Sequence, residues 1–379
     1  MAEQWVAHWG ENWRYTKEWG CWHQWRGNSW HKVRGDAHFE LARRLTREAL
    51  AWPGADAMTA GGRRALNSAS TAAALLHFVR SDPVIEATVE QWDADPWALA
   101  TPAGVVQLHA EKPGAGKLIE ASREQYCTRL TAVAPEPGVP EVWLDCLTRW
   151  FGGDDELIRY WQKFCGYCLT GSCVEKMLLF VHGKADTGKT HAVNALGECL
   201  GTYAQAASMD TFSETKHERH TTELAELNGA RFVYAPETQE GSRWNEARIK
   251  SITGKDKIRA RFMRQDQFEF VVQLKLLVYG NIPPLLRSVD DAMERRLHIL
   301  PFAYPIPREE QDLHLDDKLR REYPRILQWA IDGCMMWQRE GLGMPVVIKQ
   351  NTSEYLDGQD SFRHWMDACL IVSEGESMT

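Results

Sequence analysis

The 379-residue sequence has no apolar run close to the ~20 residues that a helix needs to cross a bilayer. It also lacks a secretory leader, because its first residues are acidic and rich in tryptophan instead of basic and then apolar. These absences exclude a membrane-spanning helix and predict a soluble, cytoplasmic protein that makes no membrane contact.

A paired set of metal-ligand cysteines is missing as well. The nine cysteines are odd in number and scattered, which favours reduced thiols over a disulfide framework. Cys165 and Cys168 form a C-x-x-C pair with Cys173 nearby, but no second pair or histidine stands at zinc-ligand spacing. We therefore interpret them as buried free cysteines in a helix, with zinc binding as the weaker alternative.

An excess of positive charge is absent too, since the formal net charge is −8. That balance excludes a protein that coats nucleic acid with its whole surface, but it leaves room for a local basic channel. Internal repeats and long low-complexity tracts are also missing. With 44% hydrophobic residues, the chain is long enough for two or three domains with cores of their own.

The N-terminal region is marked by dense tryptophan. Residues 21–30 read as a β-hairpin of two aromatic strands around a Gly-Asn turn. A second strand-and-turn signal covers residues 102–108. We interpret the tryptophans as core residues, and base stacking is the alternative. The proline-rich stretch 134–140 predicts a stiff linker and a domain boundary near residue 138.

Beyond the linker, apolar spacing predicts two helices within residues 141–170, separated at Gly152-Gly153 and with Asp154 as an N-cap. From Met177 to about Pro305, short apolar strands alternate with helices, which is typical of an α/β core. Residues after 305 are helical. The predicted domains are an α+β N-terminal domain (1–138), a helical linker or collar (139–175), the α/β core with a parallel sheet (176–305) and a C-terminal helical region (306–379).

One motif carries specific chemistry. The apolar strand 177–181 is followed at once by Gly183-Lys184-Ala185-Asp186-Thr187-Gly188-Lys189-Thr190-His191, and a helical pattern comes next. Strand, G-x-x-x-x-G-K-T loop and helix are the context of a phosphate-binding loop. Its backbone N–H groups and the helix N-terminus would bind phosphate. Lys189 would reach the β- and γ-phosphates of ATP, and Thr190 would hold Mg²⁺.

Three further candidates lie downstream. The strand 231–237 ends in Glu237, an acid suited to hold the metal's water and to polarise the attacking water. The strand 274–281 ends in Asn281, which could orient that water, although Asn before Ile-Pro-Pro is also a good turn residue. Arg295 and Arg296 precede the strand 297–300. They are either ordinary surface residues or an arginine finger, which acts on a neighbouring subunit's site and requires a ring.

The segment from residue 248 to residue 264 holds seven basic residues and one acid, a net of +6 in a chain of −8. Residues 258–263 alternate like a strand, and residues 268–272 read as the return strand. A basic hairpin between two catalytic strands suits contact with DNA phosphates in a ring pore, and a solvated charged face is the alternative. The candidate DNA-binding residues are Lys250, Lys255, Lys257, Arg259, Arg261 and Arg264.

Taken together, these segments resemble the superfamily 3 helicases, specifically the phage and plasmid primase–helicase group related to the poxvirus primase–helicase. The phosphate loop, Glu237, residues 249–256, Gly280-Asn281 and Arg295-Arg296-Leu297 follow in the order of that family. The resemblance covers most of the chain.

The resemblance implies an AAA+-like P-loop ATPase that forms a hexameric ring and translocates on single-stranded DNA, generally 3′ to 5′, during replication of a phage or mobile element. It implies that Glu237 is the Walker B acid, Asn281 the first sensor and Arg295 or Arg296 the finger, and that the hairpin around Arg264 grips DNA. It also implies a bacterial host cytoplasm if a phage encodes the chain. No primase site is apparent in residues 1–138, so primer synthesis would need a separate primase or polymerase.

Two other classes of function compete with the helicase interpretation. A ring ATPase that remodels protein would carry aromatic pore residues in the hairpin, and residues 264–267 have none. An origin-binding initiator without unwinding activity would not need an intact ATPase, whereas Lys189, Thr190 and Asn281 are all present. Stimulation of ATP hydrolysis by DNA distinguishes the three.

Overall fold

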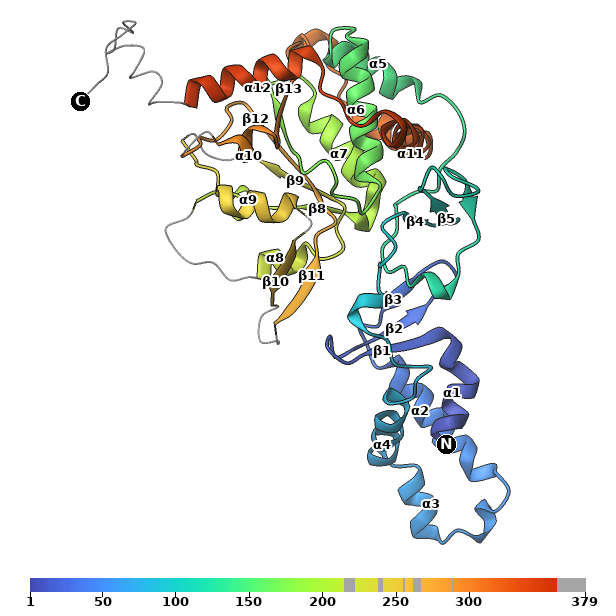
Figure 1. Cartoon of the computed structure of the whole chain (residues 1–379). Coiled ribbons are helices and arrows are strands. Elements are labelled where there is room, and N and C mark those ends of the chain that lie inside the picture. The colour runs from blue at the N-terminus through green and yellow to red at the C-terminus, as the bar shows by residue number, and fades with distance from the viewer. Residues whose placement is uncertain (215–221, 238–240, 255, 262–266, 288–289, 360–379) are drawn as a thin grey trace, which may run out of the picture. The chain divides into compact units, whose positions relative to one another are not determined.

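The computed structural model describes residues 1–214, 222–237, 241–254, 256–261, 267–287 and 290–359 (Figure 1). The chain divides into two compact units. The first comprises Met1–Val106 and Leu118–Leu130, and the second comprises Gln107–Lys117 and Thr131–Thr379. Each unit has its own hydrophobic core.

The first unit combines helices with two small antiparallel sheets, of orders β1-β2-β3 and β4-β5-β6. The predicted hairpin at residues 21–30 is confirmed, because β2 pairs with β3 and the amide of Arg26 bonds to the carbonyl of Ser29 across the turn. Its elements are α1 (Ala2–Trp9), β1 (Trp13–Thr16), β2 (Cys21–Trp25), β3 (Trp30–Lys32), α2 (Ala37–Glu48), α3 (Ala60–Leu66), α4 (Ala69–Arg80), β4 (Ala98–Thr101), β5 (Gly104–Gln107) and β6 (Leu118–Ile119).

The tryptophans of this unit form its core. Trp5 and Trp30 have no exposed surface, and Trp13 and Trp22 are each 3% exposed. Trp5, Trp13 and Trp22 contact one another edge-on or tilted, with ring centroids 5.8–6.1 Å apart. Such aromatic contacts stabilise a small sheet beyond the area that they bury. The core interpretation is confirmed for these four residues, which leaves them no face for stacking on a base.

The second unit begins with the two predicted helices and continues as an α/β core. Its elements are α5 (Glu141–Trp150), α6 (Asp155–Cys168), β7 (Leu178–His182), α7 (Lys189–Leu200), β8 (Ala204–Ala206), α8 (Thr222–Glu226), β9 (Phe232–Pro236), α9 (Glu246–Thr253), β10 (Lys257–Ala260), β11 (Phe268–Val271), β12 (Lys275–Gly280), α10 (Asp291–Glu294), β13 (Leu297–Pro301), α11 (Leu315–Glu340) and α12 (Val346–Gln359). Asp154 caps α6 as predicted, since its carboxylate accepts from the amides of Glu156 and Leu157.

Five strands form one parallel sheet of order β13-β7-β12-β9-β8. The α/β class predicted from the sequence is therefore confirmed. Because β12 lies between β7 and β9, the loops that follow these three strands meet at the carboxyl edge of the sheet, where open α/β sheets bind ligands.

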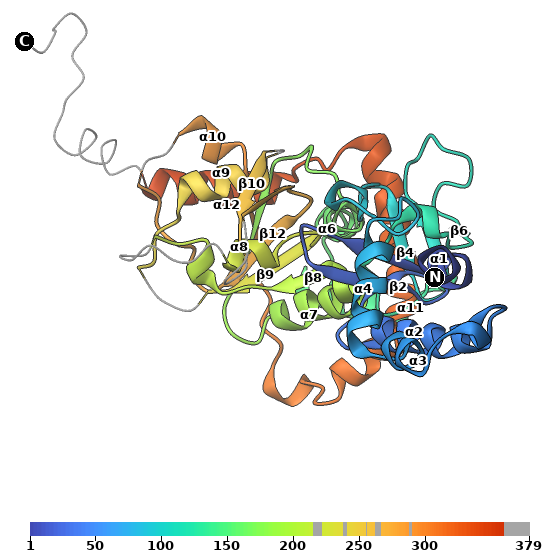
Figure 2. The same cartoon turned by 90° about the horizontal axis from the view of Figure 1, so that it is seen from below.

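Helices cover both faces of this sheet, as Figures 1 and 2 show. On one face, Phe180, Val233 and Val278 pack against residues of α9, α10 and α12. On the other, Phe164 of α6 contacts Phe232, and the hydroxyl of Tyr160 bonds to Nδ1 of His298 at 2.7 Å. Burial lowers the pKa of His298 to about 4. The strands are buried on both sides, which explains why they read as continuous apolar runs.

Two glycines hold α6 directly against α11. A Cβ on Gly166 would lie 2.6 Å from the carbonyl oxygen of Ala330, and one on Gly333 would lie 2.8 Å from the carbonyl carbon of Gln162. Both distances are too short for any side chain, so the helices touch backbone to backbone at this point. Helix α11 in turn contacts α5 and α7, which joins the C-terminal helices to the helix at the start of the α/β core.

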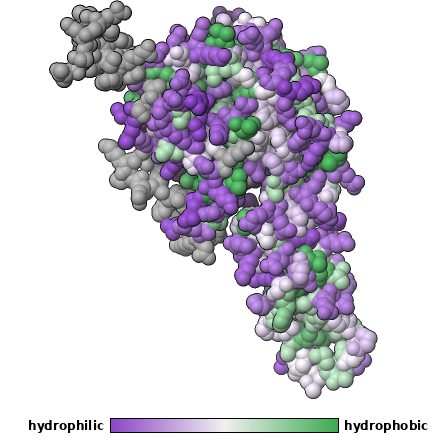
Figure 3. Space-filling model, viewed as in Figure 1, coloured by the Kyte–Doolittle hydropathy of each residue, from purple (hydrophilic) through white to green (hydrophobic). Residues whose placement is uncertain are grey.

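The cysteines of the C-x-x-C pair are buried within α6, and burial raises the pKa of Cys168 to about 12. Cys173 is buried too, and its Sγ donates to the carbonyl of Val272. This burial fits the interpretation of the three as core thiols. Among the residues described, no helix is both long and apolar enough to cross a membrane. In Figure 3 the second unit presents a mostly hydrophilic surface, whereas the end of the first unit around α3 is paler and more apolar.

Candidate functional site

An open cavity of about 510 Å³ lies at the carboxyl edge of the parallel sheet. Its walls are residues 185–191, which span the loop and the start of α7, together with Pro236, Glu237 and residues 279–282. The phosphate loop, the acid that follows β9 and Asn281 after β12 therefore line one cavity, although up to about a hundred residues of sequence separate them. Of the residues predicted for the nucleotide site, Gly183, Lys184, Arg295 and Arg296 are not part of this wall.

The loop is arranged around the amine of Lys189. Its Nζ donates to the carbonyl oxygen of Gly183 at 2.6 Å, to that of Lys184, and to Oγ1 of Thr187 at 3.2 Å. Only 8% of the residue is exposed, and burial lowers its pKa, an effect that Asp186 opposes. The ammonium group is thus held by neutral oxygens, which a phosphate would outcompete by charge.

Gly188 begins α7 in a conformation that only glycine adopts readily, with φ of +87° as the N-cap residue. The indole of Trp150, at the end of α5, lies directly against it, so that a Cβ at this position would overlap the ring. The glycine of the motif is therefore required twice, by backbone conformation and by the close approach of a buried tryptophan.

Glu237 extends from the end of β9 across the end of β12. Its amide bonds to the carbonyl of Tyr279 at 2.9 Å, and its Oε2 accepts from the amide of Ile282 at 3.1 Å. A Cβ on Gly280 would lie 2.6 Å from Cβ of Glu237 and closer still to its carboxylate. Gly280 is needed here because the carboxylate occupies the space of a side chain.

His182, the last residue of β7, was missed in the sequence. It pairs in register with Gly280 of β12, the residue before Asn281. Burial and the nearby Lys189 lower its pKa, and the backbone of Asn281 opposes them. The available signal was a polar residue ending an apolar strand immediately before the first glycine of the motif.

A second cavity of about 730 Å³ adjoins the first, because Asp186, Gly188 and His191 line both. Its other walls come from α5 and from residues 306–318. Val142, Cys146 and Trp150 supply apolar surface, and several carboxylates lie among the remaining lining residues. Sequence reasoning missed this cavity, because its two walls lie about 160 residues apart and neither carries a motif.

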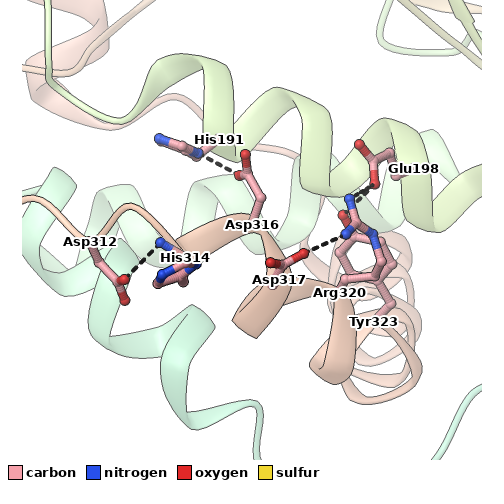
Figure 4. A network of polar contacts seen from close by, with 8 residues as sticks. All are labelled: His191, Glu198, Asp312, His314, Asp316, Asp317, Arg320 and Tyr323. Carbon is pink, nitrogen blue, oxygen red and sulfur yellow. Dashed lines mark hydrogen bonds and ion pairs between the residues drawn. The ribbon is translucent and has the colours of Figure 1, made fainter.

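Polar contacts tie the phosphate-loop helix to the first turns of α11 (Figure 4). Nδ1 of His191 lies 2.6 Å from Oδ1 of Asp316. About two turns further along α7, Glu198 accepts from the hydroxyl of Tyr323 at 2.9 Å and from Arg320 at 3.4 Å. The helix that starts at the nucleotide loop is therefore fastened to the C-terminal region at two points.

The two arginines before β13 differ in their surroundings. Arg296 donates to Oγ1 of Thr253 at 3.2 Å and to the carbonyl of Ala292 at 2.7 Å, so it is anchored within its own unit. The side chain of Arg295 is 79% exposed and lies 3.6 Å from that of Asp291, which is 87% exposed. Of the pair, Arg295 is the one that reaches into solvent.

The basic segment forms the antiparallel pair of β10 and β11. Lys257 and Arg259 share its exposed face, where Arg259 forms an ion pair of 2.7 Å with Glu269. Arg261 follows β10 and is exposed. Lys250 belongs to α9 and pairs with Asp290.

Lys255, Arg264 and Glu240, an acid that could assist Glu237, lie outside the described residues. Lys257 and Arg261 are exposed cations for which the described residues include no ion pair.

Comparisons with known proteins agree with this architecture. Residues 2–169 match the family described as D5 N terminal like, and residues 181–296 match a family of unknown function, DUF5906. A candidate helicase of Acanthamoeba polyphaga mimivirus, L207/L206, is 23% identical over 240 residues, which is 58% of this chain and 25% of that protein. A candidate helicase of Frog virus 3, 022R, is 24% identical over 246 residues, 60% of this chain and 25% of that protein. The chain thus spans about a quarter of the length of these relatives.

Solved structures share the fold. The apo structure of the NrS-1 C terminal region (305-718) aligns with 92% of this chain and 72% of its own, with a TM-score of 0.56 at 11% identity. The A form apo structure of the same region gives a TM-score of 0.53 at 9% identity over the same shares. The two family matches and the viral relatives support one likeness, to the phage and viral primase–helicase-like proteins, and the solved structures share the fold of this chain.

Proposed function

We propose that the chain is an ATP-dependent DNA helicase that translocates on single-stranded DNA during replication of a phage or related mobile element. The observation that carries the proposal is the convergence of the phosphate loop, Glu237 and Asn281 on one cavity. Those three parts are what hydrolysis of a nucleoside triphosphate requires: a phosphate cradle, an acid beside the attacking water and a polar group to orient it.

The fit of a triphosphate follows from the loop. Lys189 is already desolvated and held by carbonyl oxygens, so phosphate oxygens can replace them without moving the amine far. The amides at the start of α7 and the positive end of its dipole face the same cavity. Mg²⁺ bound between Thr190 and Glu237 would neutralise charge on the phosphates.

The remaining chemistry falls to two side chains. Glu237 would accept the proton of the attacking water or hold it through the metal's water shell, because its carboxylate lies over Gly280 and the residue lines the same cavity as the loop. Asn281 is exposed to the cavity and can donate to or accept from the water and the terminal phosphate. The second cavity suits the base and ribose, since it adjoins the loop and combines apolar walls with carboxylates that accept from a base amine.

For DNA, the proposal rests on the β10–β11 pair. Lys257 and Arg261 offer exposed positive charge, whereas Lys250 and Arg259 are engaged by acids. We propose that the first two contact the phosphates of the strand together with Lys255 and Arg264. A hexameric ring would gather these segments around one strand, and the exposed Arg295 would then serve the neighbouring subunit's site.

The test is ATP hydrolysis with and without single-stranded DNA, for the wild type and for Lys189→Ala. A second arm uses the double variant Lys257→Ala/Arg261→Ala, with Arg44→Ala/Arg63→Ala from the first unit as a charge-matched control. We expect DNA to stimulate ATP hydrolysis in the wild type and Lys189→Ala to abolish hydrolysis altogether. The double variant should lose the stimulation by DNA but keep the basal rate of hydrolysis. The salt dependence of its DNA binding should weaken by about 1.4 in log–log slope, the effect of two lost phosphate contacts.

Other outcomes identify the rivals. Turnover that ignores DNA would refute the helicase proposal and favour a ring ATPase that remodels protein. Origin-specific DNA binding without strand separation would favour a replication initiator. A forked duplex assay separates translocation from unwinding, and a separate primase or polymerase would supply primers.

A further inference from the structure

Three residues line both cavities of the second unit: Asp186, Gly188 and His191. In a nucleoside triphosphate the sugar lies between the phosphates and the base. If the phosphates occupy the first cavity and the base occupies the second, as proposed above, the sugar passes over these shared residues. Gly188 has no side chain, so Asp186 and His191 are the two shared residues that can meet a sugar with side-chain atoms.

The backbone of Asp186 is held in an uncommon conformation where the cavities meet. Its φ is +60°, in the left-handed region that few residues other than glycine adopt. Its carbonyl oxygen accepts from the amide of Ile306 at 2.8 Å, and Ile306 belongs to the wall of the second cavity. Glycine would adopt this backbone more easily, so the conformation of the loop does not explain why a carboxylate stands here.

A carboxylate is an unusual neighbour for a phosphate. Asp186 is exposed, and within the part of the chain that the structure describes its side chain makes no hydrogen bond or ion pair. Its negative charge would repel a triphosphate, whereas a hydroxyl group can donate to it. Acidic residues bind the ribose of dinucleotides in this way. The part of a nucleotide that suits Asp186 is therefore the sugar.

The ring of His191 has one nitrogen engaged by an acid. Its Nδ1 lies 2.6 Å from Oδ1 of Asp316, in the first turn of α11. Figure 4 shows the other ring nitrogen turned away from that carboxylate. Because a carboxylate only accepts hydrogen bonds, Nδ1 donates, and Nε2 of the neutral ring is an acceptor. Asp316 thus determines both the orientation of the ring and the nitrogen that can accept.

We propose that Asp186 and His191 form a ribose site, in which the carboxylate and Nε2 accept hydrogen bonds from the 2′- and 3′-hydroxyls of a ribonucleotide. Two acceptors match a diol with two donors, and 2′-deoxyribose offers one donor fewer. Asp316 is a positioning residue that acts through His191. The ribose site rests on the proposed nucleotide binding, and it names the substrate as a ribonucleotide. A replication motor with this preference would leave the deoxynucleotides to DNA synthesis.

The test measures binding and needs no hydrolysis. Calorimetry gives the affinities for ADP, 2′-deoxy-ADP and 2′,3′-dideoxy-ADP in the presence of Mg²⁺. The wild type should bind ADP about tenfold more tightly than 2′-deoxy-ADP and about a hundredfold more tightly than the dideoxy form, the effect of one and two hydrogen bonds. Asp56→Gly, which removes an exposed acid from the first unit, is the control and should keep both ratios.

Variants assign the two acceptors. Asp186→Gly suits the backbone and removes only the carboxylate, so it should lower the hundredfold ratio to about tenfold without weakening the binding of dideoxy-ADP. His191→Ala should lower the ratio similarly. Asp316→Ala should behave like His191→Ala, whereas Asp316→Asn keeps an acceptor for Nδ1 and should retain most of the preference. Melting temperatures report whether each variant is folded.

The outcomes separate the ribose site from the proposed function. Equal affinities for ADP and dideoxy-ADP in the wild type, or an unchanged ratio in Asp186→Gly, would overturn the ribose site. If the wild type binds no nucleotide, the ribose site and the ATPase proposal fail together. If it prefers ADP as expected but DNA does not stimulate ATP hydrolysis, the helicase proposal fails and the ribose site stands.

Discussion

Replacing Gly280 by alanine should disable hydrolysis while leaving the fold intact. The added Cβ would lie 2.6 Å from Cβ of Glu237, whereas ordinary contacts are 3.4–4 Å. Gly280 cannot retreat easily, because β12 is paired on both sides up to this point. The Glu237 side chain must therefore move by about 1 Å, a misplacement that can lower the rate about a hundredfold. Overpacking should lower the free energy of unfolding by about 1–3 kcal/mol.

The assay is steady-state ATP hydrolysis, with ADP affinity measured by calorimetry. The phosphate loop is untouched, so ADP affinity should stay within about threefold of the wild type. Gly35→Ala is the matched control, because a Cβ there meets nothing within 4 Å, and it should leave kcat unchanged. If Gly280→Ala also keeps a kcat within threefold of the wild type, Glu237 is not positioned for catalysis as argued above.

Three other changes probe the ring, the sheet and the helix contact. Arg295→Ala should lower kcat at least about a thousandfold. Mixing it with an equal amount of Lys189→Ala should restore about a quarter of wild-type turnover, because that share of ring interfaces combines an intact loop with an intact finger. No recovery in the mixture would exclude a finger that acts between subunits. The pKa of His298 is about 4 in the folded chain and 6.5 by its ordinary value, so the unfolded state binds the extra proton first. The free energy of unfolding should then fall by about 3 kcal/mol between pH 6.5 and pH 4 relative to His298→Gln. Urea unfolding that gives the same pH dependence of this free energy for the wild type and His298→Gln would contradict the prediction. Gly333→Ala should lower the melting temperature because its Cβ would overlap the backbone of α6, whereas Gly358→Ala, in open space on α12, should raise or maintain it.

Much of the fold could be predicted because local patterns and tertiary structure agree. Strand β7 is apolar from Leu178 to Val181, and the loop and helix that follow obey the spacing of a phosphate-binding motif. Asp154 marked a helix start and was found capping it. The order of the strands was not predictable in this way, because no local sequence pattern near β12 indicates that it inserts between β7 and β9.

The candidate site was also predictable only where a local sequence pattern marks the residue. Lys189 could be proposed from the loop motif, and Glu237 and Asn281 because each is a polar residue at the end of an apolar strand. The order of the three matched that of the family. Trp150 was not proposed as a site residue because its role depends on its contact with Gly188, which is distant in the sequence. The different surroundings of Arg295 and Arg296 also needed coordinates, because adjacent identical residues carry no distinguishing pattern.

The contact of α6 with α11 through Gly166 and Gly333 bears on how this unit can move. Helices that touch at their backbones cannot slide past each other without collision. A shear motion between them is therefore excluded, and the two behave as one rigid body. Any rotation of this helix pair must therefore occur in the segments that flank it. Gly152 and Gly153 precede α6, and Gly341 and Gly343 follow α11, all with positive φ. We expect these two glycine pairs to be the hinges on which the helical layer turns as the nucleotide loop fills and empties.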